Sequence, residues 1–306
     1  MIKKTGQFLK RIELEQVLKE ISEIEYTTIK TNKKVEYINL EVAFDIEATS
    51  TYINPDEKFA FMYLWTIGFK DSNYIYHGRT WEEFQELIQS LKILFNLSPS
   101  RRLVIYVHNL GYEFQFMRKY FEWEEVFSVD LRKPIKAVTT SGIEFRCSYI
   151  LSGFSLERLA KNLVSHKVEK LVGDLDYSLV RHSETVLTLK EIDYAINDVV
   201  IVLNYITEQL EYYGDMNNIP MTNTGRVRRF VRDRCYYTND NHKKSSRGKY
   251  QRYRRLMEDL TLTPEVYKML VRAFMGGFTH ANANYSGKVL ENVTSIDFNS
   301  SYPAVM

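Results

Sequence analysis

The 306-residue chain has only two cysteines, Cys147 and Cys235, which excludes a disulfide framework and a zinc site built on Cys-x-x-Cys. It also lacks a long hydrophobic run. The longest nearly apolar stretch, residues 59–69, is too short to span a bilayer, and residues 1–5 lead into no apolar segment of signal-peptide type. We therefore expect no membrane association, and the cysteine content fits a reducing cytoplasm.

The charge of the chain is almost balanced but unevenly placed. Hydrophobic residues make up 44% and charged residues 26%, as in ordinary globular proteins, and the length predicts about two domains. The net charge of +2 hides a basic segment, because residues 226–255 hold twelve basic residues against Asp233 and Asp240. A basic segment on an acidic body predicts a polyanionic partner.

Strand-like and helix-like patterns interleave along the chain, which predicts an α/β domain with a mixed sheet. Period-two alternation predicts strands at residues 26–31, 35–47, 59–69, 74–77, 103–108 and as a pair within 137–149. Helical periodicity predicts helices at residues 12–24, 81–95, 110–121, 156–163 and 189–213. After Gly214 the composition changes, and Pro220 with the basic segment predicts a connector to a second unit.

The strand at residues 40–47 carries two carboxylates on one face. Side chains alternate along a strand, so Asp45 and Glu47 share one face and the apolar residues share the other. Carboxylates at this spacing repel each other, and a divalent cation is the usual way to hold them together. The alternative is a half-exposed strand whose charges point into water.

A second motif, residues 107–113, leaves an apolar strand and enters a helix. Asn109 and Glu113 lie four residues apart there, where an amide and a carboxylate could grip a nucleic-acid end and a metal ion. The alternative is that Asn109 only caps the helix by accepting a bond from a free backbone N–H.

A third motif lies on the helix predicted at residues 189–213. One side of that helix is a regular apolar stripe, and the opposite side carries Tyr194, Asp198, Ile201 and Tyr205. Two tyrosines and an isoleucine indicate that this side is covered as well, and a covered Asp198 needs a metal or a donor. A partly exposed aromatic face is the alternative.

Together the motifs supply four carboxylates, Asp45, Glu47, Glu113 and Asp198, without a matching set of histidines or cysteines. Oxygen-only ligation predicts Mg²⁺ or Mn²⁺, and two such ions can activate a water and stabilise the leaving oxygen in phosphodiester cleavage. Tyr194 precedes Asp198 by one helical turn, where it can hydrogen-bond the attacking water.

In this order the motifs resemble the three exonuclease motifs of family B DNA polymerases, specifically of the protein-primed polymerases of bacteriophages and linear plasmids. Residues 45–47 match the first motif, residues 109–113 the second and residues 194–198 the third. The resemblance implies an RNase H-like domain that removes mispaired 3′ nucleotides from single-stranded DNA with two metal ions. Its positions for single-strand ligands are occupied here by Asn109, Phe116, Ser148 and Tyr177.

Two later segments resemble polymerase elements. Residues 274–278 resemble a template-binding Tyr-x-Gly-Gly/Ala motif, which implies DNA contacts for Phe274, Gly276 and Gly277. Residues 297–303 resemble polymerase motif A, which makes Asp297 a metal ligand of a polymerase site that is incomplete, because no other palm signature occurs. We therefore expect the N-terminal portion of a DNA polymerase. A terminal protein that primes replication would be a further partner, through parts beyond residue 306.

The expected domains are an N-terminal extension (1–40), the exonuclease domain (41–215), a basic connector (216–262) and the start of a palm domain (263–306). In the connector, Arg228 and Arg229 are candidates for contact with the DNA backbone. A solvated loop is the alternative for residues 239–249.

Several positions depart from the family pattern. Glu113 stands where the family has Asp, and Ala48 follows residues 45–47 where a Thr often contacts DNA. Val172 replaces a catalytic Lys, for which Lys170 is a nearby candidate.

Two other functions fit parts of the sequence. A free-standing DEDD-type nuclease would use the carboxylates but would have no use for residues 274–278 and 297–303. A non-catalytic nucleic-acid-binding module would use the basic segment and some of the 22 tyrosines for stacking, although core packing is their other role. The intact Asp45, Glu47 and Asp198 favour catalysis.

Overall fold

The structure, a computed structural model, describes residues 2–5, 8–11, 13–32, 34–70, 74–171, 179–236, 247–273 and 283–294. The chain divides into two compact units, Met1–Arg234 and Cys235–Met306. In the second unit the described elements are α8 (Arg247–Asp259), α9 (Pro264–Ala273) and the 3-10 turn η1 (Ala283–Tyr285). No helix of the described residues is long and apolar enough to cross a membrane.

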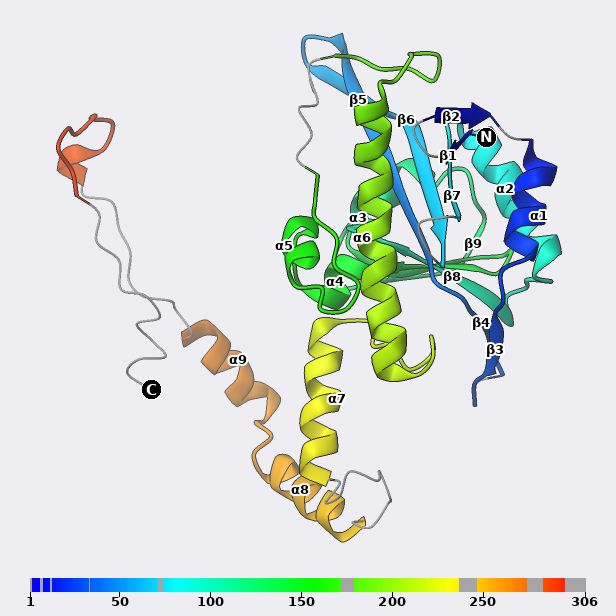
Figure 1. Cartoon of the computed structure of the whole chain (residues 1–306). Coiled ribbons are helices and arrows are strands. Elements are labelled where there is room, and N and C mark those ends of the chain that lie inside the picture. The colour runs from blue at the N-terminus through cyan, green and yellow to red at the C-terminus, as the bar shows by residue number, and fades with distance from the viewer. Residues whose placement is uncertain are drawn as a thin grey trace. The chain divides into compact units, whose positions relative to one another are not determined.

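An 11-stranded mixed sheet forms the centre of the first unit (Figure 1). Its strands are β1 (Ile2–Thr5), β2 (Phe8–Arg11), β3 (Thr27–Lys30), β4 (Glu36–Asn39), β5 (Val42–Asn54), β6 (Glu57–Phe69), β7 (Tyr74–Gly78), β8 (Arg101–Val107), β9 (Trp123–Ser128), β10 (Pro134–Thr139) and β11 (Ile143–Cys147). The main order is β2-β1-β7-β6-β5-β8-β11-β10-β9, and β4 joins β3 to β8. Strand β8 runs parallel to β4, β5 and β11, and the other pairs are antiparallel. The predicted mixed α/β class is confirmed.

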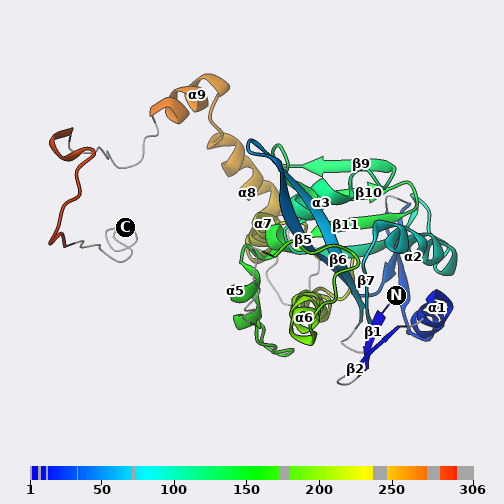
Figure 2. The same cartoon turned by 90° about the horizontal axis from the view of Figure 1, so that it is seen from above.

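Helices cover both faces of this sheet, which makes three layers (Figures 1 and 2). Helices α1 (Leu14–Ser22), α2 (Trp81–Leu94) and α3 (Leu110–Met117) add apolar side chains to the core on one face. Helices α4 (Ser148–Ser152), α5 (Leu156–Lys161) and α6 (Leu189–Tyr213) do so on the other. A last helix, α7 (Asn223–Tyr236), follows α6.

Strand β5 contributes to both cores, as its alternating pattern predicts. Val42, Phe44 and Ile46 belong to the core shared with α2, whereas Ala43 belongs to the core shared with α6. Because side chains alternate, the carboxylates of β5 point to the α6 face. The same-face placement predicted for them is therefore found, on the side that a long helix covers.

Helix α6 is buried on two sides. Thr188 and Glu191 form a capping box at its start, and Gly214 ends it with φ of 84°. Gly68 of β6 lets the helix come close, because a Cβ there would lie 2.7 Å from Leu203 Cδ1. Asp198 is buried together with the apolar stripe, and so are Ile201 and Tyr205, as the pattern of that face predicts.

Other parts differ from the expectations. The strand predicted at residues 35–47 is divided after Asn39, because β4 pairs with the start of β8 and β5 with its end. Residues 1–40 supply α1, β3 and β4 to the same sheet and core, and the segment after Gly214 contains α7 and α8. The sequence shows no periodic pattern that would distinguish β1, β2, β9 and α4 from loops.

Candidate active site

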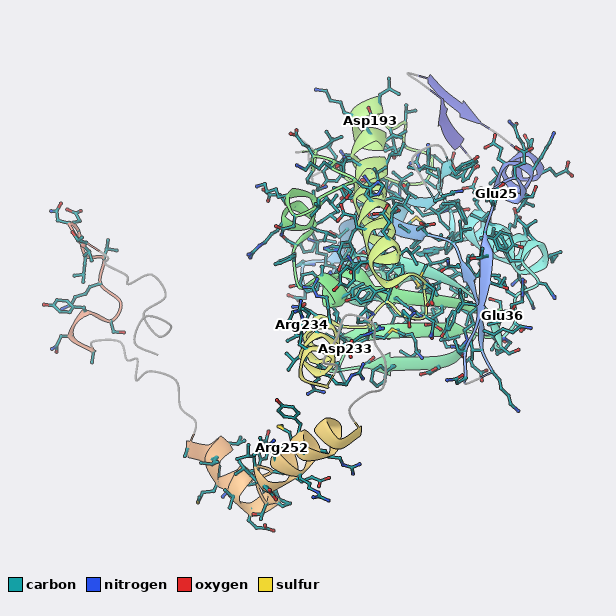
Figure 3. The ribbon with its side chains drawn as sticks, turned by 60° about the horizontal axis from the view of Figure 1, so that its bottom comes forward. Glu25, Glu36, Asp193, Asp233, Arg234 and Arg252 are labelled. Carbon is teal, nitrogen blue, oxygen red and sulfur yellow. The ribbon has the colours of Figure 1, made fainter. Side chains whose placement is uncertain are left out.

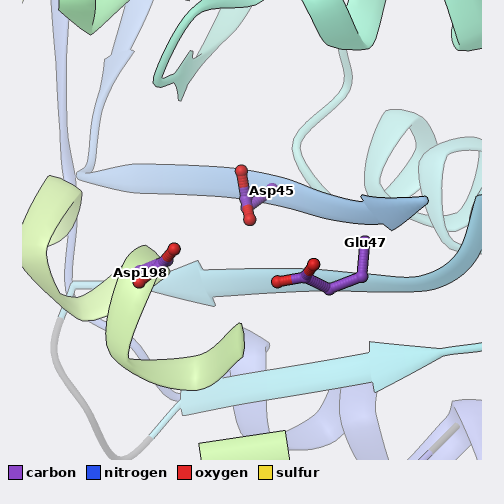
Figure 4. A group of neighbouring side chains, drawn as sticks. All are labelled: Asp45, Glu47 and Asp198. Atoms are coloured by element: carbon purple, nitrogen blue, oxygen red, sulfur yellow. The ribbon is translucent and has the colours of Figure 1, made fainter. Parts of the chain in front are cut away.

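Three carboxylates meet where α6 crosses β5. Asp45, Glu47 and Asp198 can each offer an oxygen so that all three lie within 4.8 Å of one another. Figure 4 shows these three side chains, two of which come from β5 and one from α6. The two β5 residues are half-buried and Asp198 is 9% exposed. Three oxygen ligands at this spacing suit a hard divalent cation.

The strand register sets the floor of this cluster. Asp45 lies opposite Thr66 of β6 and Glu47 lies opposite Leu64, and a register shift follows directly after Glu47. A bulge of this kind turns side chains locally and often lies beside a functional site. Here it falls at the end of the carboxylate pair.

Glu113, the fourth predicted carboxylate, lies in the first turn of α3 and is not part of the group of three, although its charge acts on Asp45. It is 4% exposed, and its Oε2 atom has no hydrogen-bond partner among the described residues. Asn109, directly before α3, has φ of 69° and makes no side-chain cap bond, so the capping alternative for Asn109 does not hold in this structure. A buried carboxylate oxygen without a partner is costly, and a cation would satisfy it.

The electrostatics of the cluster favour added positive charge. Burial, followed by the charges of Glu113 and Glu47, raises the pKa of Asp45 well above its usual range. Burial and then Asp198 raise the pKa of Glu47 to about 7. Burial also raises the pKa of Glu113 well above its usual range. Carboxylates that resist ionisation together become ionised when a divalent cation is bound.

Lys170 is the residue that the sequence only offered as a candidate, and the structure places it in the cluster. Its ammonium group donates a hydrogen bond to Asp198 Oδ1, with 14% of the lysine side chain exposed. It also lies 3.7 Å from the ring centroid of Tyr194, in a cation–π contact. Burial raises the pKa of Asp198, and Lys170 acts against that effect.

Asn197 holds the segment that carries Lys170, a role that sequence reasoning missed. Asn197 Oδ1 accepts a hydrogen bond from the backbone N–H of Leu171 at 2.9 Å, and its Nδ2 donates to the carbonyl of Glu169 at 2.9 Å. The side chain therefore grips the backbone on both sides of Lys170. Its place directly before Asp198 is the only signal the sequence offered.

The predicted strand-binding residues fall into different environments. Asn109 is exposed, and Phe116 is half-buried with its ring 5.1 Å from that of Tyr112. Ser148 is fully buried and its hydroxyl lies 3.1 Å from His108 Nδ1. Its side chain therefore faces the protein interior and not a bound DNA strand. The expected contact of Ser148 with DNA is therefore not supported by its placement.

Five predicted site residues lie outside the described residues, namely Tyr177, Phe274, Gly276, Gly277 and Asp297.

The two arginines predicted to contact the DNA backbone also differ. Arg228 is exposed on α7 and makes no ion pair with any residue that the structure describes. Arg229 is half-buried, donates to the carbonyl of Asn218 at 2.6 Å and lies 5.4 Å from the Tyr213 ring centroid. Asp233, labelled on α7 in Figure 3, lies 3.9 Å from Arg229.

Comparison with protein families assigns the domain. A family model described as 3′-5′ exonuclease matches residues 14–213, well over half of the chain. The chain belongs to the 3′-5′ exonuclease family. The matched region includes all four carboxylates and ends at the last residue of α6. No curated protein sequence matches the chain.

Solved structures of phi29 DNA polymerase have a similar fold. The complex with primer-template DNA has 16% identity and a TM-score of 0.56, and the match covers 82% of this chain and 42% of that one. The complex with single-stranded DNA has 16% identity and a TM-score of 0.55, with 80% and 41% covered. The chain thus spans about two fifths of these polymerases. The exonuclease domain has the RNase H-like mixed α/β fold.

Proposed function

We propose that this chain is a metal-dependent 3′-5′ exonuclease that removes nucleotides from single-stranded DNA ends, as the proofreading part of a protein-primed family B DNA polymerase of bacteriophage or linear-plasmid type. The observation that carries the proposal is the meeting of Asp45, Glu47 and Asp198 within 4.8 Å. The buried Glu113 oxygen, which has no hydrogen-bond partner among the described residues, supports it, because the charge of Glu113 acts on Asp45. Four carboxylates without histidine or cysteine suit two Mg²⁺ or Mn²⁺ ions.

The proposed chemistry uses the residues around this cluster. Asp45, Glu47, Glu113 and Asp198 hold the ions, which supply Lewis acidity to the attacking water and the leaving 3′ oxygen. Tyr194 orients the water, and Lys170 offers positive charge to the scissile phosphate once the ions satisfy Asp198. The Lys170 ammonium thus takes the part of the catalytic lysine that the family places at the position of Val172.

The single-stranded DNA is expected to enter the site past α3. Asn109 is exposed at the start of that helix, and Phe116 offers a ring one turn after Glu113 for stacking on a base. Tyr177, Phe274, Gly276 and Gly277 are proposed as further DNA contacts from their motifs alone. Asp297 is proposed as a metal ligand of the polymerase site, without a part in the exonuclease. We further propose a terminal protein as a partner of the polymerase. The proposed location is the cytoplasm, that of the host for a viral chain.

The test uses the 306-residue chain and a 5′-labelled single-stranded oligodeoxynucleotide, with Mg²⁺, Mn²⁺ or a chelator. Shortening of the oligonucleotide from its 3′ end should require the metal. The double variant Asp45→Ala, Glu47→Ala should be slower by roughly a thousandfold or more, because the ligands that place the ions are gone. Equal cleavage by the wild type and the double variant would contradict the proposal.

A further inference from the structure

The β5–β6 hairpin continues past the carboxylates, and in Figure 1 it reaches beyond the end of α6. Beyond Glu47, Thr49 pairs with Phe61 and Thr51 pairs with Phe59. Side chains alternate along β5, so Thr49 and Thr51 lie on the same face as Asp45 and Glu47. Cross-strand partners share a face, which places both phenylalanines on the carboxylate side of the hairpin.

Three rings on that side are stacked. Phe59 and Phe61 have ring centroids 5.9 Å apart with 26° between their planes. Phe61 and His182 follow at 5.0 Å and 17°. Phe59, at the outer end of the stack, is 50% exposed, and Phe61 is half-buried between its two neighbours. The stack is therefore nearly parallel and ends on a half-exposed ring.

The other end of the stack is His182, which is also exposed but lies on a loop whose backbone is fixed by hydrogen bonds. Arg79 donates to the carbonyl of His182 at 2.7 Å, to that of Thr185 at 2.9 Å and to that of Tyr63 at 2.7 Å. One guanidinium group thus ties the loop that bears His182 to strand β6. The Thr49 hydroxyl also donates to the carbonyl of Leu179 at 3.4 Å. These contacts fix the stack before any partner arrives, which reduces the entropy cost of binding.

We propose that Phe59, Phe61 and His182 form a stacking platform for a base of the single-stranded DNA whose 3′ end lies at the carboxylate cluster. The proposal rests on the exonuclease function proposed above and adds a site to it. Thr49 and Thr51 are two and four residues beyond Glu47, or about 7 and 13 Å along a strand. A DNA strand whose 3′ end is held at the carboxylates therefore passes the platform a short distance from that end.

The geometry favours a nucleic-acid base over a protein surface. A half-exposed, nearly parallel stack offers a ring face, which every base can use irrespective of sequence. The opposite face of the hairpin is different, since the ring of Tyr52 is 67% exposed and is covered by Lys58 Nζ at 5.5 Å from its centroid. The platform thus belongs to the carboxylate side of the hairpin only.

The platform predicts a dependence on substrate length. With Phe59→Ala in the 306-residue chain, kcat/KM for a long single-stranded oligodeoxynucleotide should fall roughly 5- to 150-fold, because one stacked base contributes about 1–3 kcal/mol. The ratio of wild-type to variant kcat/KM should rise from a dinucleotide to a dodecamer, since the short substrate does not reach the platform. Phe59→Trp keeps a ring and should keep the wild-type length dependence.

The matched control is Tyr52→Ala, which removes an exposed ring from the other face of the same hairpin and should behave as the wild type. Binding of the dodecamer in chelator, followed by anisotropy, should weaken for Phe59→Ala and not for Tyr52→Ala. If the wild type is an active exonuclease and Phe59→Ala has the same kcat/KM at every length, the platform is wrong. If the wild type has no metal-dependent activity, the exonuclease proposal itself fails.

Discussion

The ammonium group of Lys170 donates a hydrogen bond to Asp198 Oδ1, although the two residues are 28 positions apart in the chain. Asp198 is the member of the carboxylate cluster that comes from a helix. Lys170 therefore supplies positive charge to the one member of this group of three that lies on α6. This ion pair links the segment before α6 to the candidate metal site.

Replacing Lys170 by Met should slow the exonuclease about 100-fold, because the charge proposed to act on the reacting phosphate is lost while an unbranched side chain only one atom shorter is kept. Steady-state kcat in saturating Mg²⁺ is the measurement. Lys170→Arg keeps a charge and should recover part of the loss. An unchanged kcat in Lys170→Met would mean that the ammonium serves only the metal-free fold.

Asn197 should act through Lys170. Asn197→Ala removes both bonds to the backbone around Lys170, and we expect kcat to fall about tenfold with little change in KM, because a positioned charge becomes loose. Asn204→Ala is the matched control, since Asn204 Nδ2 donates at 2.9 Å to the carbonyl of His166 in the same loop. In the Lys170→Met background Asn197→Ala should add almost nothing. Full additivity of the two changes would contradict this role.

His77 should make the fold sensitive to acid. It is 1% exposed with neither ring nitrogen bonded among the described residues, and burial, followed by the charge of Arg79, lowers its pKa to about 4. Below the ordinary histidine pKa of 6.5, His77 is protonated in the unfolded chain but stays neutral in the folded protein down to about pH 4. The free energy of unfolding therefore falls as the pH falls from about 6.5 to about 4.

The variant His77→Phe removes this contribution. Relative to the variant, the wild type should lose about 2–3 kcal/mol of unfolding free energy between about pH 7 and pH 4.5. Denaturant unfolding of both proteins at the two pH values gives the difference, in which the carboxylates cancel because both proteins contain them. A difference that is the same at both pH values would rule out a neutral buried imidazole.

Replacing Arg228 and replacing Arg229 should change the salt dependence of DNA binding by different amounts. Each phosphate of a single strand that is neutralised adds about −0.7 to the slope of log K against log salt. Arg228→Gln should flatten the slope by about that amount if this exposed guanidinium contacts DNA. Arg229→Gln should flatten it less, because Arg229 already bonds to the carbonyl of Asn218. Equal slopes for Arg228→Gln and the wild type would remove Arg228 from the binding surface.

Local periodicity in the sequence was sufficient to predict part of the fold and of the site. Alternation placed Asp45 and Glu47 on one face of β5, and the covered second side of α6 was readable from Tyr194, Ile201 and Tyr205. Motif order predicted the exonuclease family that the comparison confirmed over residues 14–213. These inferences need only neighbours in sequence, which a strand or helix places at known angles.

Contacts between residues that are distant in the chain follow only from the packing of the whole domain. Only packing brings Lys170 to Asp198, lets Asn197 grip the segment before α6 and aligns His182 with Phe61. It also buried Ser148, which its motif had suggested for DNA contact, beneath the end of β8. The sequence of a loop does not indicate which distant residues its side chains will contact. Such contacts depend on the registers of several strands and on how closely α6 approaches them, and no short stretch of sequence specifies either.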